Sequence, residues 1–251
     1  MSTNHEIIDV VFDEKGVSFL SLTAAPPKKA LVGGRLEKNH YYLGQLDSVT
    51  YSLRFKSGPV DHSQSQLDPK FIKLMGENFF LQKVVCAVIG CRGTSDRFTH
   101  RVQNESFEAG KLIASYGFVT LTGGLSGVME KAAEGAKALG GRTLGILPGS
   151  EKNLANPFID IVVPSGIGIA RNYIIAQTAD ILIAVNGGRG TLEEICYGLD
   201  FDKTILSLDS WVIPGVIEIK HINEVEKYLI EYFYKTLLLN LTQRYEPGGA
   251  E

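Results

Sequence analysis

Residues 180–201 read DILIAVNGGRGTLEEICYGLDF, which is an apolar run, a glycine-rich turn and a second, less apolar segment in direct succession. The apolar residues 181–185 are typical of a buried strand, because a strand covered on both faces shows no polar alternation. Residues 191–201 are interpreted as a helix. The stretch therefore indicates a strand–turn–helix unit of the kind that builds parallel sheets.

The same pattern recurs from residue 83 onward. Further strands are predicted at 83–90, 118–124, 142–149, 159–166 and 204–208, and further helices at 105–117, 127–141, 168–179 and 223–241. In the last helix the apolar residues fall on one face: Val225, Leu229, Tyr232, Phe233, Leu237 and Leu241. Residues 81–251 are therefore predicted to form an α/β domain, a doubly wound parallel sheet of the Rossmann-like type.

Residues 1–56 are predicted to form a small β-rich N-terminal extension. Its strands are expected at 6–12, 17–22 and 48–55, the first two as a hairpin with its turn at Gly16. Residues 57–80 are read as a polar linker followed by a short helix. An extension of this size is marginal as an independent fold, so we expect it to pack on the main domain or on a partner subunit.

The composition argues against several classes of protein. A formal net charge of −3 over 251 residues disfavours a general nucleic-acid or anionic-membrane surface. No apolar run approaches the about 20 residues that span a bilayer, and the N-terminus lacks a signal-peptide pattern, so a cytoplasmic protein is expected. Cys86, Cys91 and Cys196 have no paired spacing and indicate reduced thiols, and the five histidines lack ligand spacing, so no metal site is predicted.

The turns at the carboxyl ends of the strands, where open parallel sheets bind ligands, are rich in Gly, Ser and Thr. Such turns let backbone amides approach a ligand, and the helices that follow add partial positive charge, which favours a phosphate. The ligand-binding residues predicted here are Gly90, Gly93, Thr94, Gly123, Gly124, Gly127, Asn172, Gly187, Gly188, Gly190 and Thr191. Arg92, Arg97, Arg171 and Arg189 lie in or beside these turns. For residues 123–127, close helix–sheet packing is an equal alternative.

Familiar nucleotide motifs do not fit. The turn GCRGTS at 90–95 is not G-x-G-x-x-G, and the strand 118–124 ends without an acid for a ribose hydroxyl. No G-x-x-x-x-G-K-[ST] motif occurs. A standard NAD site and a P-loop NTPase are therefore disfavoured.

Two side chains near the turns, Glu194 and Arg171, have both a structural and a functional interpretation. Thr191 and Glu194 have the spacing of a capping box, while a carboxylate beside a bound ligand is the functional alternative. Glu193 is expected to be a solvated first-turn acid. Arg171 opposes the dipole at a helix start, so it is either a surface or ion-paired residue or one held there by a ligand site.

Several spaced motifs then resemble one family. The segments 123–141, 145–149, 155–172 and 179–195 (GGLSGVMEKAAEGAKALGG, GILPG, ANPFIDIVVPSGIGIARN and ADILIAVNGGRGTLEEI) are similar to the LOG-like superfamily, once labelled lysine-decarboxylase-like. Within it, the chain most resembles the subgroup of molybdenum-cofactor carrier proteins. The resemblance covers roughly residues 83–210 and implies a Rossmann-like fold.

The Lonely Guy enzymes of this superfamily hydrolyse nucleoside 5′-monophosphates to a base and ribose 5-phosphate. Their signature is P-G-G-x-G-T-x-x-E with an Arg-Lys pair upstream, and here Asn186 replaces the Pro and Asn172 replaces the Lys. By resemblance, Arg171 and Glu194 would be the catalytic pair, while the glycines and Thr191 would hold phosphate. The Arg-Asn form resembles the carrier subgroup, for which binding is implied.

The sequence therefore favours binding of a phosphate-bearing, nucleotide-like ligand, with molybdenum cofactor as one candidate and no further cofactor required. The alternatives are a phosphoribohydrolase that cleaves an N-glycosidic bond and a nucleotide sensor. Trp211, Tyr173 and Phe98 are candidates to stack on a flat ligand or to pack in the core. By resemblance, we expect a homo-oligomer, either a dimer or a tetramer.

Overall fold

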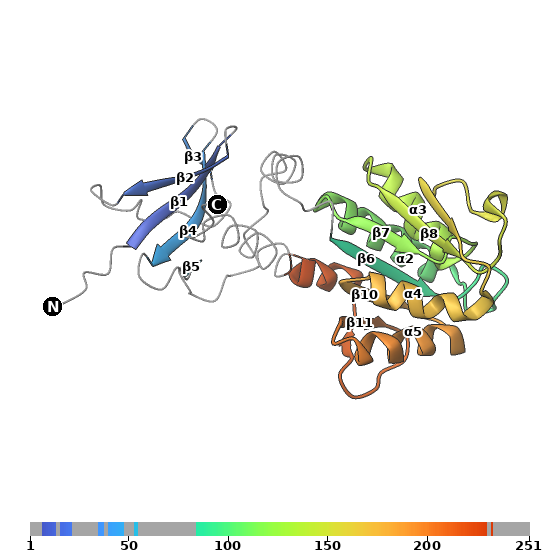
Figure 1. The fold of residues 1–251 in the computed structure, drawn as a ribbon. Helices are drawn as coiled ribbons and strands as arrows, with labels where there is room; N and C mark the ends of the chain where they lie inside the picture. The colour runs from blue at the N-terminus through green and yellow to red at the C-terminus, as the bar shows by residue number, and fades with distance from the viewer. Residues whose placement is uncertain are drawn as a thin grey trace, which may run out of the picture. The chain divides into compact units, whose positions relative to one another are not determined.

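A computed structural model of the chain describes residues 84–229, Tyr232 and five strands between residues 7 and 54 (Figure 1). These residues belong to two compact units. The N-terminal unit contains an antiparallel sheet of β1 Ile7–Asp13, β2 Gly16–Ser21, β3 Arg35–Glu37, β4 His40–Asp47 and β5 Leu53–Arg54. The predicted hairpin is confirmed as β1 and β2, whereas β3 and β4 were not predicted. The helix predicted within residues 57–80 lies outside the described residues.

The second unit is built on a seven-stranded sheet whose neighbouring strands all pair in parallel. Its strands are β6 Val85–Gly90, β7 Val119–Thr122, β8 Thr143–Leu147, β9 Ile161–Pro164, β10 Ile181–Val185, β11 Thr204–Leu208 and β12 Ile217–Ile219, in the order β12-β11-β10-β6-β7-β8-β9. The predicted doubly wound fold is confirmed. The three-residue β12 was missed, because so short a strand leaves no apolar run in the sequence.

Among the described residues, the helices that accompany this sheet include α2 His100–Ser115, α3 Val128–Ala138, α4 Arg171–Thr178 and α5 Arg189–Asp200. Helix α2 packs on α3, and α4 packs on α5. Right-handed crossovers on the two sides of β6 place these pairs on opposite faces of the sheet. Helix α2 begins before the predicted residue 105 because the Thr99 hydroxyl caps it. In the described ranges, no helix has the length and apolarity to cross a bilayer.

The contact between α2 and α3 depends on two glycines. A Cβ atom on Gly110 would lie 1.9 Å from the carbonyl oxygen of Ala132, and one on Gly135 would lie 1.9 Å from that of Phe107. Both distances are far below van der Waals contact. The helices therefore approach to a separation that only glycine allows.

The core is centred on β10, whose five residues are all buried. The edge strand β9 differs from the predicted buried strand, since Ile161 is 59% exposed and Val163 is 40% exposed. Among the described strands, β9 pairs with β8 alone. One margin of the sheet is therefore apolar and open in the single chain.

Asp180 lies at the end of the sheet opposite the strands' carboxyl ends and binds two other residues there. Its carboxylate accepts the amide of Val85 at 2.8 Å and the hydroxyl of Tyr232 at 2.9 Å. Val225 and Leu229 are fully buried, in agreement with the predicted apolar face of the last helix. Phe233, Leu237 and Leu241 of that prediction lie outside the described residues.

Candidate functional site

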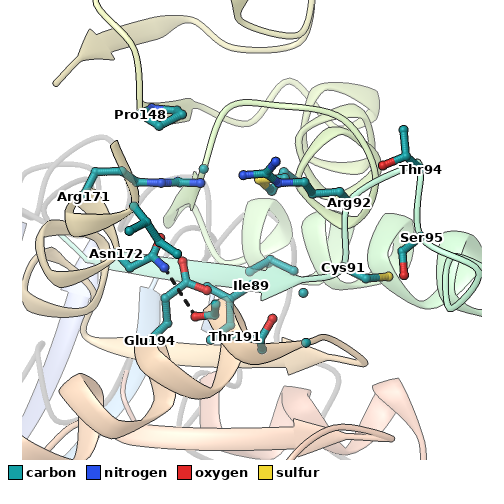
Figure 2. Close-up of a pocket in the computed structure, with 17 residues that line it drawn as sticks. Ile89, Cys91, Arg92, Thr94, Ser95, Pro148, Arg171, Asn172, Thr191 and Glu194 are labelled. Carbon is teal, nitrogen blue, oxygen red and sulfur yellow. Dashed lines mark hydrogen bonds between the residues drawn. The ribbon is translucent and has the colours of Figure 1, made fainter. Parts of the chain in front are cut away.

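A cavity of about 380 Å³ lies at the carboxyl ends of β6, β7, β8 and β10, where the strand order reverses between β6 and β10 (Figure 2). Ligands bind at this switch point in open α/β sheets. The cavity is lined by Val88, Ile89, Gly90, Cys91, Arg92, Thr94, Ser95, Gly123, Met129, Pro148, Ile169, Arg171, Asn172, Gly188, Gly190, Thr191 and Glu194. Its volume falls in the range of small-molecule sites.

Most residues predicted to bind ligand lie in this wall. Those that line the cavity are Gly90, Thr94, Gly123, Asn172, Gly188, Gly190 and Thr191, together with Arg171 and Glu194. Those that do not are Gly93, Gly124, Gly127 and Gly187. The fold therefore brings the turns together as expected but turns some of their glycines away from the cavity.

The glycines outside the wall let the turns pack closely. A Cβ on Gly127 would lie 2.4 Å from the amide nitrogen of Gly93, so these two loops touch through their backbones. A Cβ on Gly187 would lie 2.3 Å from Thr191 Oγ1, and one on Gly124 would lie 2.8 Å from Leu147 Cδ2. Gly124 and Gly127, for which packing was the alternative to phosphate binding, therefore lie at close contacts outside the cavity wall.

Helix α5 begins at Arg189, directly after the glycine turn, and its first residues line the cavity. Gly188 is the N-cap residue, and its carbonyl oxygen accepts the amide of Leu192 at 3.1 Å. The amides of residues 188–191 donate to no backbone acceptor within the described ranges. Unpaired first-turn amides and the positive end of the helix dipole together favour an anion.

The capping-box interpretation of Thr191 and Glu194 is wrong. Because α5 begins two residues earlier, Thr191 lies inside the first turn and Glu194 in the second. Glu194 is 7% exposed and lines the cavity. Glu193 is not in the first turn either, and it is half-buried.

Arg171 begins α4 and is 6% exposed, so the surface interpretation of this residue is also wrong. Its Nη1 donates to the carbonyl oxygen of Ile146 at 2.9 Å, and a Cβ on Gly123 would lie 2.1 Å from the same nitrogen. Burial lowers the pKa of this guanidinium and the charge of Glu194 raises it. Figure 2 shows Arg171 and Arg92 pointing toward each other across the cavity.

The buried carboxyl of Glu194 holds its proton unusually tightly. Desolvation raises its pKa from 4.5 to about 8, and the attraction of Arg171 offsets this only in part, while Glu193 adds to it. No hydrogen bond joins the Glu194 carboxyl to another described residue. At neutral pH the cavity therefore contains a protonated acid beside a permanent cation.

Asn172 joins α4 to α5. Its Nδ2 donates to Glu193 Oε2 at 3.1 Å and to the carbonyl oxygen of Gly190 at 3.4 Å, the second bond being weak. The amide therefore holds the carboxylate of Glu193 and the first turn of α5. A lysine at this position would instead carry a second buried cation next to Arg171.

The four arginines near the turns have different positions. Arg171 is buried in the cavity wall, and Arg92 lies in the wall but is exposed. Arg97 donates from Nη1 to the carbonyl oxygen of Gly187 and does not line the cavity, and Arg189 is exposed and does not line it either. Of these four arginines, Arg92 and Arg171 therefore line the cavity.

The remaining lining consists of hydroxyl groups and apolar side chains. Thr94, Ser95 and Thr191 contribute hydroxyls. In the part of the chain that the structure describes, no group of three or more His, Cys, Asp or Glu side chains is placed to hold a metal ion. The hydroxyl groups of Thr94, Ser95 and Thr191 are hydrogen-bond donors that suit an oxyanion.

Sequence reasoning missed the apolar part of the wall. It comes from Val88, Ile89, Cys91, Met129, Pro148 and Ile169. Pro148 and Ile169 follow strand ends in glycine-containing turns, so their position in the sequence was a usable signal. The aromatic candidates Trp211, Tyr173 and Phe98 do not line the cavity, and Tyr173 packs edge-on against Tyr197 and Phe201 instead.

Asn186 fixes the shape of the glycine turn. It has a φ of 52° and donates its amide to the carbonyl oxygen of Leu208 at 2.9 Å. Proline cannot adopt this φ and has no amide hydrogen. The Pro found in the Lonely Guy signature therefore requires a differently shaped turn.

We expect the Asn186→Pro variant to lose about 3 kcal/mol or more of unfolding free energy, because both the backbone conformation and the hydrogen bond are lost. Urea denaturation measures the change. Asn186→Gly is the matched control, since glycine keeps the amide and tolerates positive φ. Equal stability of the Pro and Gly variants would contradict this account of the turn.

Comparison with protein families identifies a family for this chain. Residues 83–236 match the model described as the SLOG cluster4 family. An uncharacterized protein of Archaeoglobus fulgidus is 42% identical over 145 residues, which are 58% of this chain and 91% of the relative. A cytokinin riboside 5′-monophosphate phosphoribohydrolase of Mycobacterium tuberculosis is 31% identical over 113 residues, 41% of this chain and 60% of the enzyme.

Solved structures give similar results. The molybdenum cofactor binding protein of Rippkaea orientalis has 29% identity and a TM-score of 0.56, over 61% of this chain and 98% of its own. The molybdenum cofactor carrier protein of Chlamydomonas reinhardtii has 29% identity and a TM-score of 0.53, over 59% of this chain and 98% of its own. Both likenesses cover most of the relative and leave a large part of this chain unmatched.

Proposed function

Because this chain belongs to the SLOG cluster4 family, whose model matches residues 83–236, we propose that its cavity binds a small ligand through a phosphate group. The ligand class is a phosphorylated heterocycle, which includes the nucleoside monophosphates and the molybdenum cofactor. The observation that carries the proposal is the cavity wall in which the α5 amides and the guanidinium of Arg171 meet. A buried cation and free amides are an effective combination for a phosphate.

A carrier role is favoured over turnover by Asn172. The side-chain amide is engaged by Glu193 and Gly190, so it links two helices and supplies no charge to a substrate. Two of the similar structures are, by their names, a molybdenum cofactor binding protein and a molybdenum cofactor carrier protein. Molybdenum cofactor would here be cargo, held by its phosphate.

A phosphoribohydrolase is the second candidate, and Glu194 favours it. A carboxyl with a pKa of about 8 is protonated at neutral pH and can donate a proton. In N-glycosidic cleavage, that proton would pass to the departing base as its bond to the ribose carbon breaks. Water would then bond to that carbon and return a proton to the Glu194 carboxylate. The relative from Mycobacterium tuberculosis is named for this class of reaction.

One experiment separates the two candidates. Purified full-length protein is examined by native mass spectrometry for retained ligand and is then incubated with nucleoside 5′-monophosphates, with free base measured by chromatography. Retained or added phosphorylated ligand without base release supports the carrier. Base release that is lost in Glu194→Gln supports the hydrolase. If no phosphorylated compound binds, both candidates are wrong.

We also propose that the chain forms a homo-oligomer through the open margin of its sheet. The apolar side chains of Ile161 and Val163 are exposed on β9, and parallel sheets are ordinarily covered on both faces. A second copy of the chain would cover them. Light scattering should show a dimer or tetramer that dissociates in the double variant Ile161→Asp, Val163→Asp, and a monomeric wild type would exclude this proposal.

A further inference from the structure

Two side chains that do not line the cavity bind the glycine turn before α5. Arg97 follows β6 and donates from Nη1 to the carbonyl oxygen of Gly187. Trp211 follows β11 and donates from Nε1 to the carbonyl oxygen of Gly188 at 2.9 Å. Gly188 itself lines the cavity, whereas neither donor does. The carbonyl oxygen of Gly188 also accepts the amide of Leu192 at 3.1 Å, so Trp211 and the first turn of α5 hold it together.

The geometry of the peptide group converts these contacts into a direction for the amides. In a planar trans peptide, the carbonyl of one residue and the amide of the next point in opposite directions. The contact of Arg97 with the Gly187 carbonyl therefore sets the direction of the Gly188 amide, and the contacts of the Gly188 carbonyl set that of the Arg189 amide. These amides are among those without a backbone acceptor in the described ranges.

We propose that Arg97 and Trp211 are positioning residues, which hold the glycine turn so that the amide of Gly188, a residue of the cavity wall, faces the phosphate of the ligand. The inference rests on the proposed phosphate binding and adds to it the two residues that set the turn. Neither touches the ligand. Their contribution is to fix the amides before binding, so that no reorganisation accompanies it.

Trp211 is itself held in place by the strand that precedes it. The hydroxyl of Ser207, in β11, donates to the carbonyl oxygen of Trp211 at 2.9 Å. Arg101, in α2, forms an ion pair with Asp209 at 3.0 Å in the same loop. The main chain at Trp211 is therefore bound to β11, and Asp209 of the same loop is paired with α2.

The test replaces Trp211 by Phe, which keeps an aromatic ring and removes the N–H donor. Calorimetric titration of the full-length protein with adenosine 5′-monophosphate and with adenosine separates the phosphate contribution from the rest. We expect about a five- to tenfold weaker affinity for the monophosphate, which corresponds to the net contribution of about one hydrogen bond. The affinity for adenosine should be unchanged. Val212→Ala, an exposed neighbour, is the matched control and should bind as the wild type does.

A second measurement does not need a ligand. In nitrogen–proton correlation spectra of the free protein, Trp211→Phe should shift the amide signals of Gly188 and Arg189 while leaving those of β7 in place. The chain has one tryptophan, so its single indole N–H signal and its fluorescence should both respond to the monophosphate.

The possible outcomes separate the two proposals. Wild-type binding of the monophosphate with no change in Trp211→Phe, or an equal loss for adenosine, would overturn the positioning role and leave phosphate binding intact. Unshifted turn amides in the free variant would overturn it as well. A wild type that binds no monophosphate would overturn phosphate binding and the positioning role together.

Discussion

The Glu194→Gln variant is expected to have an unfolding free energy about 5 kcal/mol above that of the wild type near pH 9, and an equal one below pH 4.5. The wild-type carboxyl has a pKa of about 8 in the folded chain and an ordinary value of 4.5. The folded state therefore binds the proton more tightly than the unfolded state. Its stabilising effect is complete below pH 4.5 and is lost as the pH rises to about 8, at about 1.4 kcal/mol per pH unit.

Gln is the neutral isostere of the protonated acid, so it removes the titration and keeps the shape of the wall. Denaturant unfolding at a series of pH values measures the difference. Glu193→Gln is the matched control: it should retain the pH dependence and lower the pKa of Glu194, because the charge of Glu193 helps to raise it. A stability difference that is constant from pH 4 to pH 9 would contradict the burial argument.

The second large effect is expected from Arg171→Gln, which should weaken binding of adenosine 5′-monophosphate about 100-fold or more. Removing one partner of a buried charge pair costs about 2–5 kcal/mol, and the guanidinium of Arg171 is buried in the cavity wall. Calorimetric titration at neutral pH measures the loss. Arg171→Lys restores the charge without the planar group that packs on Gly123, so its affinity should lie between those of Arg171→Gln and the wild type.

The other arginines provide graded controls for this prediction. Arg92 also lines the cavity but is exposed, so Arg92→Gln should lose less affinity, about three- to tenfold. Arg189 is exposed and lies outside the wall, so Arg189→Gln should bind as the wild type does. Equal losses in all three variants would mean that net charge, and not the position of Arg171, governs binding.

The order of strands and helices in the second unit was predictable because buried parallel strands have continuous apolar sequences. Residues 181–185 are entirely apolar and entirely buried. The errors lie where that signal fails: β12 is too short, and the apolar residues of β9 cannot reveal that β9 is an edge. Which strand lies at the margin follows from the order of pairing, and the local sequence does not encode that order.

The candidate site was predictable as a set of turns, because parallel strands bring their carboxyl ends to one side. The direction of individual groups was not predictable. Gly123 faces Arg171 in the wall while the adjacent Gly124 packs on Leu147, and spacing cannot distinguish the two. The capping interpretation of Thr191 failed because α5 begins at Arg189. Its N-cap residue is Gly188, and no side chain caps the helix.

The link from Asp180 to Val85 and Tyr232 has a practical consequence for handling the protein. Val85 begins β6 and Asp180 precedes β10, so the hydrogen bonds lie at the end of the sheet remote from the cavity. They bring Val85 and Tyr232, near the two ends of the α/β unit, to the same residue. The chain therefore enters and leaves this unit at the end remote from the binding mouth, so immobilisation through that end in biosensor measurements would keep the mouth accessible.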